Sequence, residues 1–302
     1  MVASGVISLR RAETDEDLEA WRRVRIAVLP NERTSSVEEL RRAETPERLL
    51  LVAELEGELA GSGFANRSDQ AGIGSLGPRV LPAARRRGVG TALLRALAEH
   101  LVSLGFPRTN AQVDDEGSLA FAARFGFREV DRQLQQVRTI GPREEPPRPP
   151  DGIELVTLAE RPELSRPVYT ELAVEALEDI PVDPPLAISL EDWERDWATF
   201  PEGSFVALAG EEIVGCAGLM RDADRADRAE HGLTAVRRDW RGRGVARALK
   251  QATIAWAAAN GLRELYTWTQ RGNENMQGVN ERLGYVVRSR SVMVRAPIPL
   301  RS

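Results

Sequence analysis

Hydrophobic and polar residues follow the same order in the first and second halves of the chain. Each half opens with a strand-like run and continues into a helical region: Val6–Arg10 then 15–28, and Gly152–Val156 then 163–178. A pair of strands joined by a glycine-containing turn follows in each half: Leu49–Ala53 with Leu59–Ala65, and Phe205–Ala209 with Ile213–Leu219. Short apolar runs separated by Glu56-Gly57 and by Ala209-Gly210 predict hairpins.

A second helix is expected after the fourth strand of each half. Its apolar residues recur at three- and four-residue spacing: Val89, Leu93, Ala96, Leu97 and Leu101 in the first copy, and Val245, Leu249, Ala252 and Trp256 in the second. This spacing is typical of a helix with one face on a sheet. The alternation of elements predicts an α/β (α+β) fold class, in which each half forms a mixed, mostly antiparallel twisted sheet flanked by helices.

The two halves form an internal repeat. Gly88 and Gly244 are 156 residues apart, and Gly126 and Gly284 are 158 apart. A near-constant offset between unrelated positions indicates a duplication. The Pro-rich, charged stretch between the halves is incompatible with a helix or an inner strand. We therefore expect an N-terminal domain at 1–140, a linker at 141–151 and a C-terminal domain at 152–302, which suits the length of 302 residues.

Composition narrows the possible partners and the compartment. The net charge of −5 argues against a nucleic-acid or membrane binder. Cys216 is the single cysteine, which leaves no disulfide framework and favours a reducing cytoplasm. The sequence shows neither a signal-peptide core nor an apolar run of about 18 residues. We expect a cytoplasmic monomer or homodimer, and we assign no metal site.

A short Arg/Gly turn stands between the fourth strand and the second helix in both halves. It reads Arg241-Gly242-Arg243-Gly244-Val245-Ala246 after Val236, and Arg85-Arg86-Arg87-Gly88-Val89-Gly90 after Val80. Glycine allows close approach of the backbone, and the first N–H groups of a helix point unpaired at one spot of positive potential. The turn predicts a receptor for the diphosphate of a nucleotide-like cofactor, with charge-assisted contacts from Arg241, Arg243 and Arg247. A solvated Arg/Gly loop is the alternative.

Together with residues further along, these turns resemble those of a tandem member of the GNAT superfamily of N-acetyltransferases. The downstream matches are Asn273, Asn275, Met276 and Asn280–Tyr285 in the C-terminal half, and Asp115, Ser118 and Phe125–Phe127 in the N-terminal half. The resemblance implies acetyl-CoA as cofactor, with its pyrophosphate on the turn and its pantetheine arm along strand four. The implied cofactor residues are Thr234, Ala235, Val236, Arg241, Gly242, Arg243, Gly244, Val245, Ala246, Asn273, Asn275, Met276 and Asn280, and in the N-terminal half Val80, Arg85, Arg86, Arg87, Gly88, Val89, Gly90 and Thr91.

Acetyl transfer to an amine needs a group that takes the amine proton and a source of a proton for the departing thiolate. Glu230 lies six residues before Val236. Strict alternation places both on one side of the strand with Gly232 and Thr234, so Glu230 is our candidate base. An exposed acid at a strand start is the alternative, and His231, expected on the opposite face, is a second candidate base.

The proton donor is harder to assign. The family commonly uses a tyrosine on the short helix that precedes the Gly-aromatic pair, and this chain has Asn280 there. Tyr266 on the fifth strand is a substitute candidate, whereas a buried structural tyrosine or protonation by solvent are the alternatives. In the N-terminal half, Gly74 lies six residues before Val80 and Ala122 replaces Asn280. We therefore expect a catalytic C-terminal domain and a degenerate N-terminal domain that retains a turn for acyl-CoA.

The leading hypothesis is an acetyl-CoA-dependent N-acetyltransferase that acetylates the amine of a small molecule in a direct ternary complex, since Cys216 is not near the turn. An acidic stretch at 175–183 would suit a cationic amine, or would be a solvated helix end. The layout is similar to that of mycothiol synthases, which makes a mycothiol-like acceptor an alternative. A non-catalytic acyl-CoA-binding or sensing protein is a further alternative. An Arg-rich nucleic-acid binder is a third hypothesis, which the net charge opposes.

Overall fold

The computed structural model describes residues 5–301 of the chain. The chain forms two compact units. Unit 1 comprises the described residues up to Asp131 together with those from Ser291 onward, and unit 2 comprises Arg132–Arg290. These limits differ from the predicted domain ends at 140 and 152 because the last strand of each half passes into the other unit.

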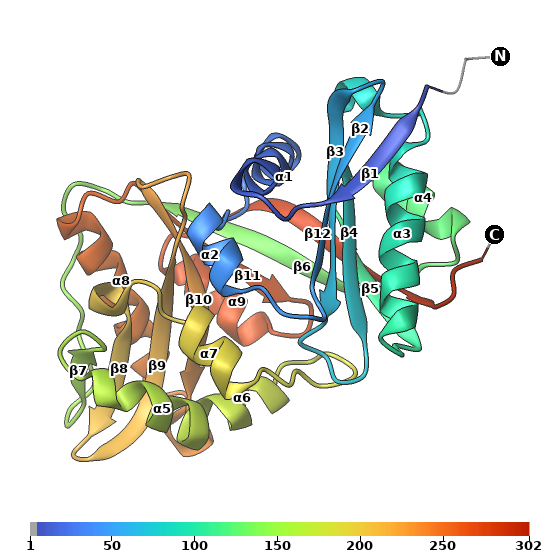
Figure 1. Ribbon diagram of the computed structural model, residues 1–302. Coiled ribbons are helices and arrows are strands. Elements are labelled where there is room, and N and C mark those ends of the chain that lie inside the picture. Colours follow the sequence, from blue (N-terminus) through green and yellow to red (C-terminus); the bar gives the residue numbers. More distant parts are fainter. Residues whose placement is uncertain (1–4, 302) are drawn as a thin grey trace. The chain divides into compact units, whose positions relative to one another are not determined.

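Unit 1 is a mixed sheet with α1 on one face and α3 on the other (Figure 1). Its strands lie in the order β1-β2-β3-β4-β5-β12; β4 and β5 are parallel and the other pairs are antiparallel. Its elements are β1 (Ile7–Arg11), α1 (Asp15–Val28), α2 (Val37–Arg42), β2 (Leu49–Leu55), β3 (Glu58–Arg67), β4 (Gly74–Val80), η1 (Pro82–Ala84), α3 (Val89–Ser103), β5 (Arg108–Val113), α4 (Glu116–Arg124) and the end of β12 (Val286–Pro297).

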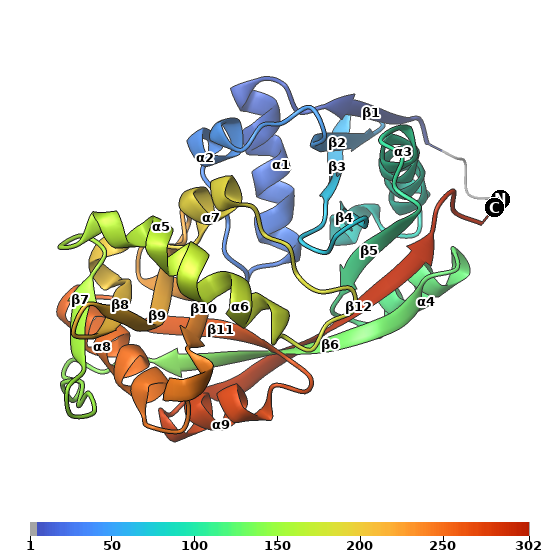
Figure 2. The same cartoon turned by 90° about the horizontal axis from the view of Figure 1, so that it is seen from below.

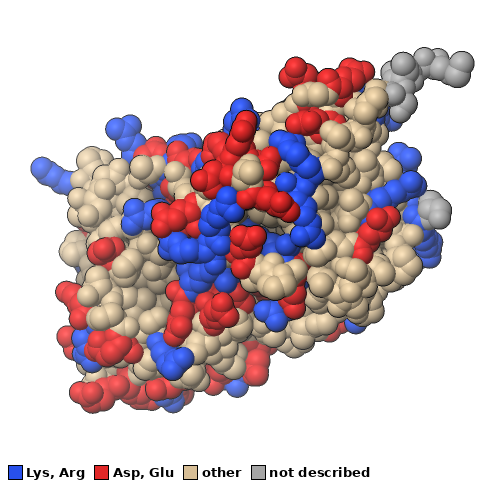
Figure 3. Space-filling model, viewed as in Figure 1, with Lys and Arg blue, Asp and Glu red and all other residues tan. Residues whose placement is uncertain are grey.

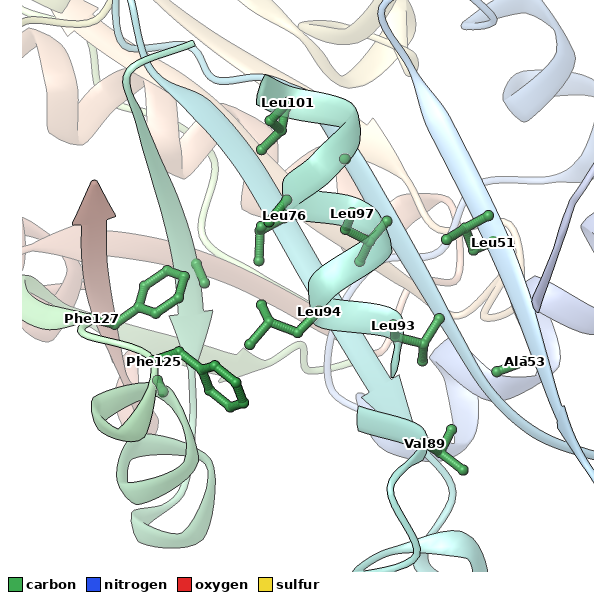
Figure 4. Close-up of a cluster of buried hydrophobic side chains, with 14 of the residues drawn as sticks. Leu51, Ala53, Leu76, Val89, Leu93, Leu94, Leu97, Leu101, Phe125 and Phe127 are labelled. Atoms are coloured by element: carbon green, nitrogen blue, oxygen red, sulfur yellow. The ribbon is translucent and has the colours of Figure 1, made fainter. Parts of the chain in front are cut away.

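The core of unit 1 is the contact between α3 and the sheet (Figure 4). Leu93, Leu97 and Leu101 recur along one face of α3 and are fully buried. They belong to one cluster with Leu51 of β2 and Leu76 of β4. The apolar spacing therefore produces the predicted helix, and the burial of its leucines fixes the position of the turn that precedes it.

Unit 2 repeats this architecture with its strands in the order β6-β11-β10-β9-β8-β7. Helices α8 and α9 cover one face of these strands, and α5, α6 and α7 lie on the other (Figure 2). Its elements are β6 (Arg128–Thr139), β7 (Glu154–Thr157), η2 (Pro162–Leu164), α5 (Ser165–Val168), the π-helical turn η3 (Tyr169–Ala173), α6 (Val174–Glu178), α7 (Leu190–Asp196), η4 (Pro201–Gly203), β8 (Phe205–Ala209), β9 (Glu212–Arg221), β10 (Arg228–Val236), η5 (Arg238–Trp240), α8 (Val245–Ala259), β11 (Glu264–Gln270), α9 (Glu274–Arg282) and the start of β12.

The final strands of the two halves are exchanged. β6, from the first half, pairs antiparallel with β11 of unit 2 from Glu264↔Thr139 to Gln270↔Gln133. The end of β12, from the second half, pairs antiparallel with β5 of unit 1 from Val292↔Val113 to Pro297↔Arg108. Each sheet needs an antiparallel partner for its fifth strand, and in both units the other half of the chain supplies it.

Two structural features concern nucleic acids and membranes as partners: the distribution of surface charge and the character of the helices. Basic and acidic side chains are interspersed over the face shown in Figure 3. Among residues 5–301, none of the helices combines the length and the apolar character that crossing a membrane requires.

Candidate active site

The turn before α8 has the geometry expected of an anion receptor. Gly244 caps the helix at φ 91° without a side-chain cap, and Gly242 has φ 75°. The first helical hydrogen bond runs from Ala248 N to Gly244 O at 3.0 Å. In the described part of the chain, the N–H groups of residues 244–247 have no acceptor, and a Cβ built on Gly242 would meet nothing within 4 Å. These open amides fit a diphosphate group.

The arginine side chains of this turn are partly engaged within the protein. Arg241 Nε donates to Val236 O at 3.0 Å, and Arg241 Nη2 lies 2.6 Å from Asp179 Oδ2. The Arg243 guanidinium carbon lies 4.8 Å from the centroid of the Trp240 ring. The backbone amides of the turn are therefore open to a ligand, whereas the Arg241 guanidinium is paired with Asp179.

Unit 1 contains the same turn. Gly88 caps α3 at φ 93°, and Arg86 stands at φ 62° where unit 2 has Gly242. Arg85 Nε donates to Val80 O at 3.3 Å, which repeats the contact of Arg241. Arg87 pairs with Glu56 at 3.0 Å. Both repeats therefore have this turn, and the turn by itself does not indicate which unit is catalytic.

The parallel pairing of strands β10 and β11 ends at Glu230. Their register runs from Arg228↔Glu264 to Glu230↔Tyr266 and stops there, while β10 continues to Val236. Beyond Glu230, the β10 amides that point away from β9 have no partner strand in this register. Thr234 Oγ1 is buried with no hydrogen-bond partner among the described residues. This opening fits an extended polar arm such as pantetheine.

A β-bulge overturns the expected alternation along β10. Glu230 lies opposite Met220 and His231 opposite Leu219, but Thr234 lies opposite Ala217, so β10 contains one extra residue between them. Paired residues of antiparallel strands share a face. Glu230 therefore does not share a face with Thr234 and Val236, as strict alternation predicted. It does lie on the face opposite His231, which confirms that part of the prediction.

Glu230 and Tyr266 form the central contact of the site. The Tyr266 hydroxyl donates to Glu230 Oε2 at 2.9 Å. Tyr266 is fully buried, and the guanidinium carbons of Arg228 and Arg288 lie 5.5 and 5.6 Å from its ring centroid. Burial, and then the charge of Glu230, raise the pKa of Tyr266. The phenol thus stays protonated and holds the carboxylate, and it is too weak an acid to favour proton transfer to a thiolate.

His231 lies in a separate buried cluster on the α8 face. Its Nε2 lies 2.6 Å from the Tyr285 hydroxyl, and the ammonium of Lys250 lies 5.4 Å from the Tyr285 ring centroid. Burial, and then the charge of Lys250, lower the pKa of His231 well below its usual value. Burial also lowers the pKa of Lys250, the single lysine of the chain, to about 7. The structure does not bring His231 and the Glu230 carboxylate together.

The predicted cofactor residues of α9 have different environments. Asn273 caps the helix by accepting from Met276 N at 3.4 Å, and Asn275 is exposed in the first turn. Asn280 is buried, and its Nδ2 donates to Gln136 Oε1 at 2.9 Å. Its Oδ1 has no partner in the described part of the chain. Asn280 could accept a hydrogen bond from a ligand there, but it has no proton to give as an acid.

The face of β10 that carries Glu230 is covered by aromatic residues of unit 2. Trp193 and Trp197 stack with ring centroids 4.2 Å apart. Trp197 Nε1 donates to Leu233 O at 3.2 Å. A Cβ on Gly218 would lie 2.5 Å from Trp197 Nε1, so glycine is required at this close approach. Trp193 and Trp197 thus form a wall on this face of β10.

Unit 1 lacks the corresponding acid. The parallel register of β4 and β5 places Ser75 opposite Asn110, at the positions of Glu230 and Tyr266 in unit 2. The predicted counterpart, Gly74, was wrong by one residue because β10 has the bulge and the described register of β4 with β3 is continuous. Unit 1 therefore has neither a carboxylate nor a phenol at this position.

Comparison with known proteins decides the family. The model of the acetyltransferase (GNAT) family matches residues 12–127 and 167–285. The chain belongs to the GNAT family of acetyltransferases. The match in both halves confirms the tandem organisation predicted from the repeat, and it makes this protein an N-acetyltransferase of that family.

Relatives and solved structures agree with this assignment. Mycothiol acetyltransferase from Catenulispora acidiphila is 27% identical over 249 residues, covering 78% of this chain and 76% of that protein. The mycothiol acetyltransferase of Brachybacterium faecium is 30% identical over 234 residues, covering 74% and 69%. A GCN5-related N-acetyltransferase structure from Sphaerobacter thermophilus has a TM-score of 0.75 at 23% identity, covering 97% and 96%. A tandem GNAT protein from the clavulanic acid biosynthesis pathway has a TM-score of 0.74 at 20% identity, covering 97% and 98%. These two structures confirm the fold.

Proposed function

We propose that unit 2 transfers an acetyl group from acetyl-CoA directly to the amine of a small molecule, with Glu230 as the general base. One observation carries this proposal: the half-buried Glu230 is held by the Tyr266 hydroxyl where β10 and β11 diverge. A carboxylate held by a protonated phenol is oriented to take the amine proton, directly or through water.

The same unit offers a complete set of groups for the cofactor. The amides of residues 244–247 would hold the diphosphate, and Thr234 Oγ1 with the open edge of β10 would hold the pantetheine arm. A backbone N–H near Val236 would polarise the acetyl carbonyl. When bound, acetyl-CoA supplies the acetyl group as a thioester activated toward amines.

Direct transfer is favoured over a covalent acetyl-enzyme. Cys216 is the single cysteine of the chain, and it is buried on β9. Burial raises its pKa to about 12, so the thiol stays protonated and unreactive near neutral pH. We further propose that solvent returns the proton to the leaving thiolate, since Tyr266 is too weak an acid and Asn280 has no proton to give. Unit 1, which has Ser75 at the position of Glu230, is proposed to be non-catalytic.

The acceptor is proposed to be a small amine, with a mycothiol-related amine as the specific candidate. The mycothiol acetyltransferases that match most of the chain favour that candidate. The acidic stretch at 175–183 is weaker support for a cationic amine as acceptor than its composition suggested. Glu175 and Asp179 in it are both within ion-pair distance of Arg238. The expected cytoplasmic location and the expected monomer or homodimer remain predictions.

The proposal is tested by acetyl-CoA-dependent thiol release with a panel of amines: amino sugars, polyamines and the amine form of mycothiol that lacks its acetyl group. We expect turnover with at least one of them, and loss of it in Glu230→Gln but not in Glu191→Gln, which removes an exposed carboxylate of α7. Exchange of label between acetyl-CoA and CoA in the absence of amine would contradict direct transfer. Unchanged turnover in Glu230→Gln would remove Glu230 as the base.

A further inference from the structure

Two arginines next to the cofactor turn converge on one carboxylate from a distant part of unit 2. Arg238 Nη2 lies 2.7 Å from Asp179 Oδ1, and Arg241 Nη2 lies 2.6 Å from Asp179 Oδ2. Arg238 belongs to η5, Arg241 begins the turn, and Asp179 directly follows α6. Both carboxylate oxygens of Asp179 are therefore engaged by the segment that leads into α8.

This carboxylate adds a negative charge next to the proposed diphosphate receptor. Arg241 Nε is fixed on Val236 O at 3.0 Å, which keeps its guanidinium between the end of β10 and the start of α8. The hydrogen bonds from Arg238 and then Arg241 lower the pKa of Asp179 to about 2, so the group is ionised throughout the neutral range. An incoming diphosphate meets this charge and competes with it for the same arginines.

Unit 1 provides the natural comparison. Arg85 makes the same contact with the last carbonyl of its strand, at Val80 O. Within residues 5–301, however, Arg85 has no ion pair with a carboxylate at salt-bridge distance. The arginine-to-carbonyl contact is thus a property of the turn in both repeats, whereas the Asp179 contact belongs to the unit that contains Glu230.

We infer that Asp179 is an internal anion that occupies Arg238 and Arg241 before the cofactor binds, and that the diphosphate of acetyl-CoA displaces it. The inference rests on the function proposed above. The side chains of Asp179, Arg238 and Arg241 are 30%, 56% and 46% exposed, and ion pairs so open to water are weak. A diphosphate offers more charge and more oxygens to the same guanidinium groups, so the exchange favours the cofactor.

Displacement of Asp179 would also affect the segment that connects α6 to α7. Asp179 joins α6 to the segment that leads to Ile188, whose carbonyl accepts from the Tyr169 hydroxyl at 2.9 Å. That segment continues into α7, which carries Trp193, the stacking partner of Trp197. Release of Asp179 would therefore loosen the segment that leads to the tryptophan wall beside Glu230.

The first test is calorimetric titration of coenzyme A into wild type, Asp179→Asn and the control Glu191→Gln. We expect Asp179→Asn to bind coenzyme A about three- to tenfold more tightly, because a competing charge is removed, with the gain shrinking as salt is raised. Glu191→Gln should match wild type. If Asp179 instead positions the arginines for the diphosphate, Asp179→Asn binds equally or more weakly, and the inference is overturned while the proposed function stands. No heat with wild type would overturn both.

The second test follows hydrogen exchange of the 175–188 segment by mass spectrometry. In wild type we expect exchange there to rise when coenzyme A is added, whereas in Asp179→Asn it should be fast from the start. The helix α3 of unit 1 provides an internal reference that should not change with the variant. Protection of 175–188 by coenzyme A in wild type would contradict displacement, and it would do so even if the affinity of Asp179→Asn had risen.

Discussion

The Tyr266 hydroxyl donates to the Glu230 carboxylate at 2.9 Å, and the two residues occupy the last paired position of parallel strands β10 and β11. The pairing register, and not only proximity, sets this contact. In unit 1 the corresponding last pair is Ser75 and Asn110. The same backbone position therefore carries an acid held by a phenol in one repeat and two neutral polar residues in the other.

Replacing Glu230 tests whether this acid takes the amine proton. We expect Glu230→Gln to lower kcat by about 10²- to 10⁴-fold, the usual contribution of a positioned general base. The affinity for coenzyme A should not change, because the diphosphate and pantetheine contacts lie elsewhere on unit 2. Steady-state kinetics with calorimetry separate the two effects. A variant that lost coenzyme A affinity and turnover in parallel would indicate a structural role for Glu230.

Tyr266→Phe tests the role of the phenol as a donor to the acid. Removing a hydrogen bond to a charged group should lower kcat about tenfold with little change in KM for acetyl-CoA. The raised pKa of Tyr266 keeps the phenol protonated well above neutral pH. Any alkaline limb of the wild-type pH profile should therefore persist in the variant. Loss of that limb would show that Tyr266 itself titrates during turnover.

The paired turns allow a test of which unit is catalytic. Gly244 and Gly88 have φ of 91° and 93°, so an aspartate at either position strains the backbone and places a negative charge at a helix N-terminus. We expect Gly244→Asp to abolish turnover and Gly88→Asp to retain most of it. Circular dichroism should first establish that both variants fold. Activity that persists in Gly244→Asp but disappears in Gly88→Asp would assign catalysis to unit 1.

The repeat, the hairpins and the two Arg/Gly turns could be predicted from the sequence, because each depends on residues that lie close together in it. The bulge between His231 and Thr234 was not predicted, since it is defined by the register against Ala217 and Leu219 of β9. That single extra residue also explains the wrong counterpart of Glu230 in the first half.

The strand exchange and the Asp179 contact depend on tertiary pairing. β6 and β12 have 12 residues each, and the pattern of either is compatible with the fifth strand of both halves. Helices α2 and α7 were missed because they are short. Their caps are nevertheless visible in the sequence as Ser36 with Glu39 and Ser189 with Asp192. The partners of Arg238 and Arg241 became apparent only with the structure.

Lys250 provides a prediction about stability that is independent of catalysis. It is 1% exposed on α8, and burial lowers its pKa from 10.5 to about 7. Between these values the unfolded chain binds a proton that the folded chain does not, so the free energy of unfolding rises with pH across this window. Lys250→Met removes the cost of burying the charge, by up to about 5 kcal/mol below pH 7 and by progressively less toward pH 10.5.

Thermal or urea unfolding at several pH values between 6 and 10 measures this difference. We expect Lys250→Met to be more stable than wild type at pH 6, and the two curves to converge as pH approaches 10.5. Arg247→Met removes an exposed cation from the same helix and should give a small difference that does not vary with pH. A constant gap between Lys250→Met and wild type across the whole range would mean that Lys250 is charged in the folded protein and stabilised by an anion near Tyr285.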